Sequence, residues 1–277
     1  MFSEAQLTQL ASELDQSART RQQLTHFSQR FPGMSVDDGY RISRAWVQMQ
    51  IANGSQVIGH KIGLTSRAMQ VSSQIEEPDY GTLPDHMLYT AKPGEVLDIP
   101  AHNFIVPRVE VELAFVLHKP LIGPGLPGGK EIGLQDVLDA TQYVTPAIEI
   151  IDSRIEQFDR TTKEPRKVYD TISDNAANAG VVVGAERVSP NDVDLAWCGA
   201  ILTVNGIVEE TGLAAGVQGN PAIGVAWLAN KLARWGESLA ANELILAGSF
   251  TRPIVANRGD VFNADYGRLG QLRFRFV

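Results

Sequence analysis

Apolar side chains recur at helical spacing through the first fifty residues. Ser3 followed by Gln6 has the form of a capping box, and Ser35 with Asp38 repeats it after a turn. A second apolar stripe follows Ser35 and ends before Asn53-Gly54, a pair typical of helix ends. The pattern therefore predicts two amphipathic helices. Their apolar positions are Leu7, Leu10 and Leu14 in the first helix and Val36, Tyr40, Val47 and Ile51 in the second.

Short apolar runs separated by Gly, Pro and Asn turns replace this spacing after residue 56. Asn205-Gly206 stands between two such runs, as in a hairpin with a type I′ turn. The clearest later helix begins with Asn220 as N-cap and Pro221 at its first position. The predicted strands lie at residues 57–63, 87–89, 95–99, 104–117, 144–152, 181–183, 201–204, 207–210, 244–246, 261–266 and 271–277.

The expected fold is α+β and β-rich, because many short strands with few long helices favour a roll over a doubly wound sheet. We expect a helical N-terminal part at residues 1–80, packed on a β-rich core at residues 81–277. A chain of 277 residues with 44% hydrophobic composition can fill one large core. The two parts should therefore form one structural unit.

Two acidic residues interrupt the apolar run at residues 107–117. Because side chains alternate along a strand, Glu110 and Glu112 should share one face about 6–7 Å apart. Glu149 lies in a second apolar run of the same kind. Buried like charges require protons, basic partners or a cation. Arg108 with another basic residue could neutralise the pair, and a metal site is the alternative.

Three carboxylates without a neighbouring His or Cys suit a hard cation such as Mg²⁺ or Mn²⁺, whereas zinc is disfavoured. Such an ion keeps open positions for water and for an oxygen-rich substrate. Glu110, Glu112 and Glu149 are accordingly the candidate metal ligands.

Several segments resemble the fumarylacetoacetate hydrolase superfamily. The resemblance rests on residues 108–115 around the paired acids, residues 146–149 and the segment Gly59-His60-Lys61-Ile62-Gly63. Residues 76–81, 170–175 and 248–251 resemble the branch of 2-hydroxydienoate hydratases and oxalocrotonate decarboxylases. The similarity extends over nearly the whole chain.

This resemblance implies a mixed β-sandwich roll in which Glu110, Glu112 and Glu149 hold one Mg²⁺ that the 1-carboxylate and 2-oxygen of the substrate chelate. Lys61 matches the active-site lysine of the family, although a lone lysine is usually a solvated surface group. Asp79 matches an active-site aspartate of the hydratases. Both become candidates for proton transfer.

A dicarboxylate substrate also needs a site for its distal carboxylate. The candidates are Arg166, Lys167, Ser173 and Thr251, whose basic or hydroxyl groups can bind an anion. Arg166 and Lys167 belong to the polar segment 153–169, which has the length of a lid. Residues 170–180 are expected to form a wall of the pocket.

Composition and charge limit which classes of partner the protein can bind and where it is expected to work. The formal charge of −8 and a pI near 5.2 argue against a nucleic-acid partner. The single cysteine, Cys198, excludes an intramolecular disulfide and suits a reducing cytoplasm, and no apolar stretch approaches a membrane span of about 20 residues. We expect a cytoplasmic protein with a small 2-oxo dicarboxylate as its substrate. The resemblance implies a homo-oligomer, a pentamer or a decamer.

Three activities compete. The first is Mg²⁺-dependent hydration of a 2-oxo or 2-hydroxy dienoate in aromatic catabolism, on a seven-carbon dicarboxylate or on 2-hydroxypenta-2,4-dienoate. The second is decarboxylation with the same chelate. The third is a catalytically silent partner of a related enzyme, which the presence of all three glutamates and Lys61 argues against.

Overall fold

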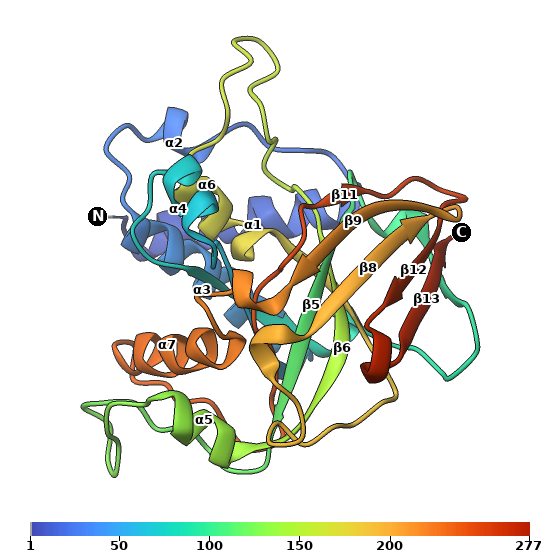
Figure 1. Ribbon diagram of the computed structural model, residues 1–277. Coiled ribbons are helices and arrows are strands. Elements are labelled where there is room, and N and C mark those ends of the chain that lie inside the picture. The colour runs from blue at the N-terminus through green and yellow to red at the C-terminus, as the bar shows by residue number, and fades with distance from the viewer. Residues whose placement is uncertain (1) are drawn as a thin grey trace.

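The computed structural model describes residues 2–277 and contains two β-sheets, with most helices gathered on the side away from the smaller sheet (Figure 1). The larger sheet has eight strands in the order β2-β1-β10-β5-β6-β7-β3, with β11 also paired to β5. Its strands are β1 Val57–Gly63, β2 Asp79–Pro84, β3 Leu88–Thr90, β5 Arg108–Leu117, β6 Thr141–Ile151, β7 Asn178–Val183, β10 Leu244–Leu246 and β11 Ile254–Val255.

The smaller sheet has five strands in the order β4-β13-β12-β8-β9. The predicted hairpin between β8 and β9 is confirmed, and Asn205 and Gly206 both have positive φ, as a type I′ turn requires. Phe262 and Phe274 of this sheet stack on each other, Phe276 meets both rings edge to face, and all three belong to the main core. The five strands are β4 Leu97–Ile99, β8 Gly199–Val204, β9 Ile207–Leu213, β12 Val261–Asp265 and β13 Gln271–Phe276.

The helices follow the apolar pattern of the sequence. Both predicted capping boxes are confirmed, at Ser3 and at Ser35. Asn220 caps α7, and Pro221 occupies its first turn. The helices are α1 Glu4–Thr20, α2 Phe27–Arg30, α3 Val36–Ala52, α4 Arg67–Ser73, α5 Leu134–Ala140, α6 Val168–Ser173 and α7 Pro221–Ala233. Among residues 2–277, no helix has both the length and the apolar composition needed to cross a bilayer.

A separate apolar cluster joins the N-terminal helices to the sheet region. Leu10 and Leu14 of α1 pack with Ile42 and Trp46 of α3 and with Ile155, which follows β6. The predicted boundary at residue 80 falls inside β2, and both β1 and β2 belong to the eight-stranded sheet. Helix α3 is the last helix before the first strand of that sheet, which begins at Val57, and the short helix α4 lies between β1 and β2.

Strand β9 of the smaller sheet lies close to the backbone of the loop after β10 at Gly212. A Cβ added at Gly212 of β9 would lie 1.9 Å from the carbonyl oxygen of Phe250, and the amide of Phe250 donates to Val111 of β5. Gly212 therefore lets the loop 248–251 lie between the two sheets.

Replacing Gly212 with alanine should lower the free energy of unfolding by about 1–3 kcal/mol, because backbone must move to admit the methyl group. Gly216→Ala is the matched control, since its Cβ would meet only Phe250 at 3.9 Å. Urea denaturation followed by circular dichroism measures both. Equal stability of Gly212→Ala and Gly216→Ala would contradict the close approach.

Candidate active site

Pairing of the two longest strands brings three carboxylates together. Glu110 of β5 lies directly opposite Glu149 of β6, and Glu112 follows on the same strand. One oxygen from each of the three side chains lies within 4.8 Å of the others. Glu112 and Glu149 are each only 1% exposed. Glu110 is partly exposed, so the cluster lies in the middle of the larger sheet with two carboxylates buried and one open to one side.

Burial of like charges changes the ionisation of these groups. Burial and the charge of Glu149 raise the pKa of Glu110 from 4.5 to about 8. Burial, with the charges of Glu149 and Glu110, also raises the pKa of Glu112. One oxygen of Glu112 accepts a hydrogen bond from the Gly248 amide at 2.8 Å, whereas Oε1 is buried without a hydrogen-bond partner. An all-oxygen donor set with one such unpartnered oxygen fits a hard divalent cation.

Arg108 forms no ion pair with the glutamates, although its charge lowers the pKa of Glu110 against the larger effect of burial. Its Nη2 donates to the side-chain oxygen of Gln157, and no ion pair within 4.0 Å joins it to Glu110 or Glu112 among the described residues. The cation closest to the cluster is Lys61, whose Nζ lies 3.5 Å from Glu149.

Lys61 and Asp79 come from neighbouring strands. Antiparallel pairing of β1 with β2 places Gly63 opposite Asp79. A Cβ added at Gly63 would lie 2.3 Å from Asp79 Oδ1 and 3.0 Å from Lys61 Nζ, so this glycine leaves room for both groups. Lys61 and Asp79 are 4% and 1% exposed. The sequence had placed Lys61 between glycines but had given no distance to Asp79.

The two groups differ in how burial affects them. Burial lowers the pKa of Lys61, but Glu149, Asp79 and the other acids outweigh it and raise the pKa overall. The side chain therefore remains an ammonium. Burial raises the pKa of Asp79, although Lys61 opposes the rise, and both carboxyl oxygens lack a hydrogen-bond partner. Asp79 therefore keeps its proton to a higher pH than a solvated aspartate does.

The loop after β10 is attached to β5 between the acidic positions. Ser249 donates to the Val111 carbonyl at 3.2 Å, and the hydroxyl of Thr251 accepts from the Val111 amide at 3.1 Å. Together with the bond from Gly248 to Glu112, these contacts place the predicted Thr251 beside the cluster.

The other predicted substrate groups differ in position. The guanidinium of Arg166 is 12% exposed, donates to the Ile155 carbonyl and lies 3.7 Å from Asp174. Its charge lowers the pKa of Asp79 against the larger effect of burial. Lys167 is exposed at the N-terminus of α6, and the Ser173 hydroxyl donates to the Tyr169 carbonyl. Of these three groups, the structure brings Arg166 closest to the acids.

Asn178 is a site residue that the sequence did not single out. Its Nδ2 donates to Glu149 at 2.8 Å, and its carbonyl accepts from Arg154, which also pairs with Asp174. The whole segment 170–180 had been expected to form a pocket wall. No local sequence signal distinguishes Asn178 from its polar neighbours there.

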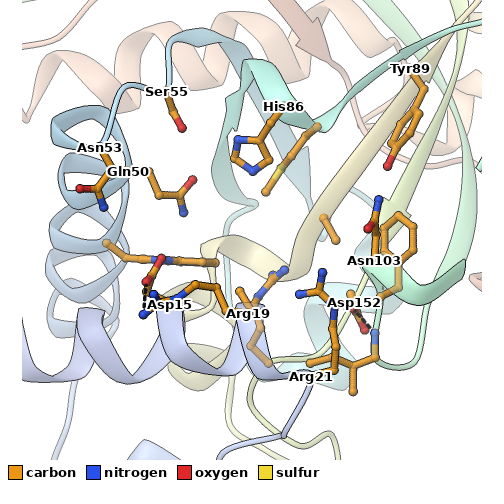
Figure 2. A pocket seen from close by; sticks show the side chains of 17 residues that line it. Asp15, Arg19, Arg21, Gln50, Asn53, Ser55, His86, Tyr89, Asn103 and Asp152 are labelled. Atoms are coloured by element: carbon orange, nitrogen blue, oxygen red, sulfur yellow. Dashed lines mark hydrogen bonds and ion pairs between the residues drawn. The ribbon is translucent and has the colours of Figure 1, made fainter. Parts of the chain in front are cut away.

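A cavity of about 590 Å³ lies elsewhere, between α1, α3 and the start of β3. Figure 2 shows Gln50 on one side of it, with His86 and Tyr89 above Arg21. None of the nine predicted site residues lines this cavity. It is therefore separate from the glutamate cluster.

The comparisons with known proteins identify the family. The family described as Fumarylacetoacetate (FAA) hydrolase C-terminal matches residues 56–277. The chain therefore belongs to the fumarylacetoacetate hydrolase family, and the two-sheet architecture confirms the expected fold.

Relatives that match over nearly the full length show to which branch of the family the chain belongs. It is 52% identical over 277 residues to 2-oxo-hept-4-ene-1,7-dioate hydratase of Escherichia coli, with all of both chains covered. It is 38% identical to 2-hydroxyhexa-2,4-dienoate hydratase of Comamonas testosteroni over 95% of each chain. The chain is thus a hydro-lyase of the hydratase and decarboxylase branch.

Solved structures support the same branch. The chain matches 4-oxalocrotonate decarboxylase from Pseudomonas putida G7, complexed with magnesium and adipate, with a TM-score of 0.90 and 31% identity. The match covers 100% of this chain and 99% of that one. The same decarboxylase has also been solved with calcium and acetate. Together with the carboxylate cluster, these structures indicate a divalent metal.

Stabilisation by Mg²⁺ should depend on pH. Because the folded pKa of Glu110 is about 8 against 4.5 when solvated, the metal-free protein loses stability as pH rises between these values. Mg²⁺ must displace that proton below about pH 8. Saturating Mg²⁺ should therefore raise the Tm by several degrees more at pH 8.5 than at pH 6.5, as measured by calorimetry.

Glu112→Gln should reduce this increment at both pH values and weaken Mg²⁺ binding at least about tenfold, because a charged ligand is lost while volume is kept. Glu95→Gln is the control, since that carboxylate is exposed beside Lys92. An equal increment at both pH values, or normal Mg²⁺ binding by Glu112→Gln, would refute the metal assignment.

Proposed function

We propose that this enzyme hydrates 2-oxo-hept-4-ene-1,7-dioate to 4-hydroxy-2-oxo-heptanedioate in homoprotocatechuate catabolism. The observation that carries the reaction class is the cluster of Glu110, Glu112 and Glu149 beside the Lys61–Asp79 pair. The substrate is supported by the relative that is 52% identical over the whole chain.

Glu110, Glu112 and Glu149 are the proposed ligands of Mg²⁺, with Mn²⁺ as the alternative ion. The bound ion would withdraw electrons from the 2-oxo acid and so favour its enolate and a conjugated, electrophilic alkene. Asn178 holds Glu149 in place, and the Gly248 amide holds Glu112. The protein therefore fixes the orientation of two of the three carboxylates before any ligand arrives.

Lys61 and Asp79 are the proposed proton-transfer groups. Removing a proton from C3 and adding one at C5 moves the double bond into conjugation with the ketone. Water then adds its oxygen to C4 and a proton to C3, which gives the 4-hydroxy-2-oxo acid. The ammonium of Lys61 stabilises the enolate oxygen, and Asp79, with its raised pKa, carries the proton.

For the substrate carboxylates we propose Arg166 and Thr251 as the leading groups, because both lie near the acids. Ser173 and Lys167 remain proposed contacts of lower rank. The Ser173 hydroxyl already donates to a backbone carbonyl, and the Lys167 side chain is exposed. We also propose a cytoplasmic homo-oligomer, a pentamer or a decamer. Exposed apolar side chains such as Trp197 (72%) and Ile207 (66%) offer surface for subunit contacts.

Decarboxylation is the second candidate, favoured by the TM-score of 0.90 to 4-oxalocrotonate decarboxylase. Both reactions use the electron-withdrawing chelate, but decarboxylation releases CO₂ in place of adding water. A catalytically silent partner would show neither product.

Purified protein with Mg²⁺ should convert 2-oxo-hept-4-ene-1,7-dioate to the 4-hydroxy acid without releasing CO₂. The kcat/KM should exceed that for 2-hydroxypenta-2,4-dienoate, because groups that bind the distal carboxylate stay unpaired with the shorter acid. Chromatography of products and CO₂ trapping measure the two reactions. Release of CO₂ would show that the enzyme is a decarboxylase. A higher kcat/KM for the shorter acid would refute the assignment of a dicarboxylate substrate.

Lys61→Met should lower kcat at least about 100-fold while KM changes little, because the lost charge acts on the developing enolate. Lys92→Met serves as the control, since that side chain is 76% exposed. Steady-state kinetics on both variants separate the two parameters. A loss confined to KM would make Lys61 a substrate-binding residue.

A further inference from the structure

Arg108 is placed to reach the same space as the metal-binding acids. It begins β5, and the two-residue period of a strand puts its side chain on the face that carries Glu110 and Glu112. A step of two residues spans about 6.6 Å along the strand, so Arg108 is the next side chain beyond Glu110 on this face. A substrate held at one end by the cluster would extend toward it.

Gln157 links Arg108 to Arg166. Its side-chain oxygen accepts from Arg108, and its carbonyl oxygen accepts from the amide of Arg166 at 2.9 Å. The bridge between Phe158 and Pro165 closes the same loop. The loop thus carries Arg166 to a position beside the start of β5.

Three arginines, Arg108, Arg154 and Arg166, lie close together at this junction. Arg154 and Arg166 share Asp174, while Arg108 has no carboxylate within 4.0 Å among the described residues. Burial lowers the pKa of Arg166, and the charges of Arg154 and Arg108 lower it further, whereas Asp174 and Asp170 raise it. A partly buried guanidinium without an acidic partner is stabilised by an anion.

The surroundings of the glutamate cluster are charged in the opposite sense. Glu110, Glu112, Glu149 and Asp79 face one ammonium, that of Lys61. The site therefore has an acidic end suited to a cation and an arginine-rich end suited to an anion. This division matches a ligand that binds a metal through one carboxylate and has a second carboxylate further along its chain.

We propose that Arg108, together with Arg166, binds the distal carboxylate and that Arg108 determines the preference for dicarboxylates. The inference rests on the proposed hydratase function and adds to it a specificity residue. Gln157 positions Arg108, whereas Arg108 itself contacts the substrate.

Arg108→Gln tests this assignment on two substrates. With Mg²⁺ present, kcat/KM for 2-oxo-hept-4-ene-1,7-dioate should fall about 10- to 100-fold, the range expected for a lost charged hydrogen bond. The value for 2-hydroxypenta-2,4-dienoate should change less than about threefold. Arg108→Lys should recover part of the lost preference, because charge is kept without the planar guanidinium.

Arg275→Gln is the matched control, since this arginine pairs with Asp98 on the surface of the smaller sheet. The ratio of the two kcat/KM values is the decisive quantity, because a defect in folding or metal binding lowers both alike. Equal losses on both substrates, or an unchanged ratio, would overturn the role of Arg108. If Arg108→Gln does not fold, an unchanged ratio in Arg108→Lys would overturn it as well.

Failure of the proposed function gives a different result. Wild-type protein that does not hydrate the dicarboxylate, or that prefers the five-carbon acid, would refute the function before any variant is compared. A wild-type preference for the dicarboxylate that persists in Arg108→Gln would refute only the present inference.

Discussion

The close approach of three carboxylates on two adjacent strands, two of them buried, is the constraint on which the rest of the site depends. Glu110, Glu112 and Glu149 repel one another in a region from which water is largely excluded. The sheet tolerates them because neighbouring groups compensate in part. The Gly248 amide and Asn178 each donate one hydrogen bond, and Lys61 supplies one positive charge. The remaining negative charge is what a divalent cation or bound protons must balance.

This constraint also explains why distant segments converge on β5 and β6. The loop 248–251 donates a hydrogen bond to Glu112, and Gly212 of the smaller sheet leaves room for the backbone of this loop. Gly63 leaves space for Lys61 and Asp79 in the same way. The surrounding glycines therefore serve the packing of charged groups, and the fold and the chemistry share the same close contacts.

Local patterns predicted the elements better than the contacts between them. The two-residue period placed Glu110 and Glu112 on one face, and capping boxes and the Asn205-Gly206 turn marked helix and hairpin ends. The register that sets Glu110 opposite Glu149 depends on long-range pairing, which no local pattern encodes. The link from Asn178 to Glu149 and the placement of Arg108 beside Gln157 likewise arise only in the folded chain. The roles of Lys61 and Asp79 came from the family resemblance.

The three glutamates are proposed to form one divalent-cation site. Crystals grown with Mn²⁺ allow its direct test by anomalous scattering, because the peak locates the ion without reference to activity. We expect one strong peak bounded by carboxylate oxygens of Glu110, Glu112 and Glu149. A peak elsewhere, or no peak at this cluster with saturating Mn²⁺, would contradict it.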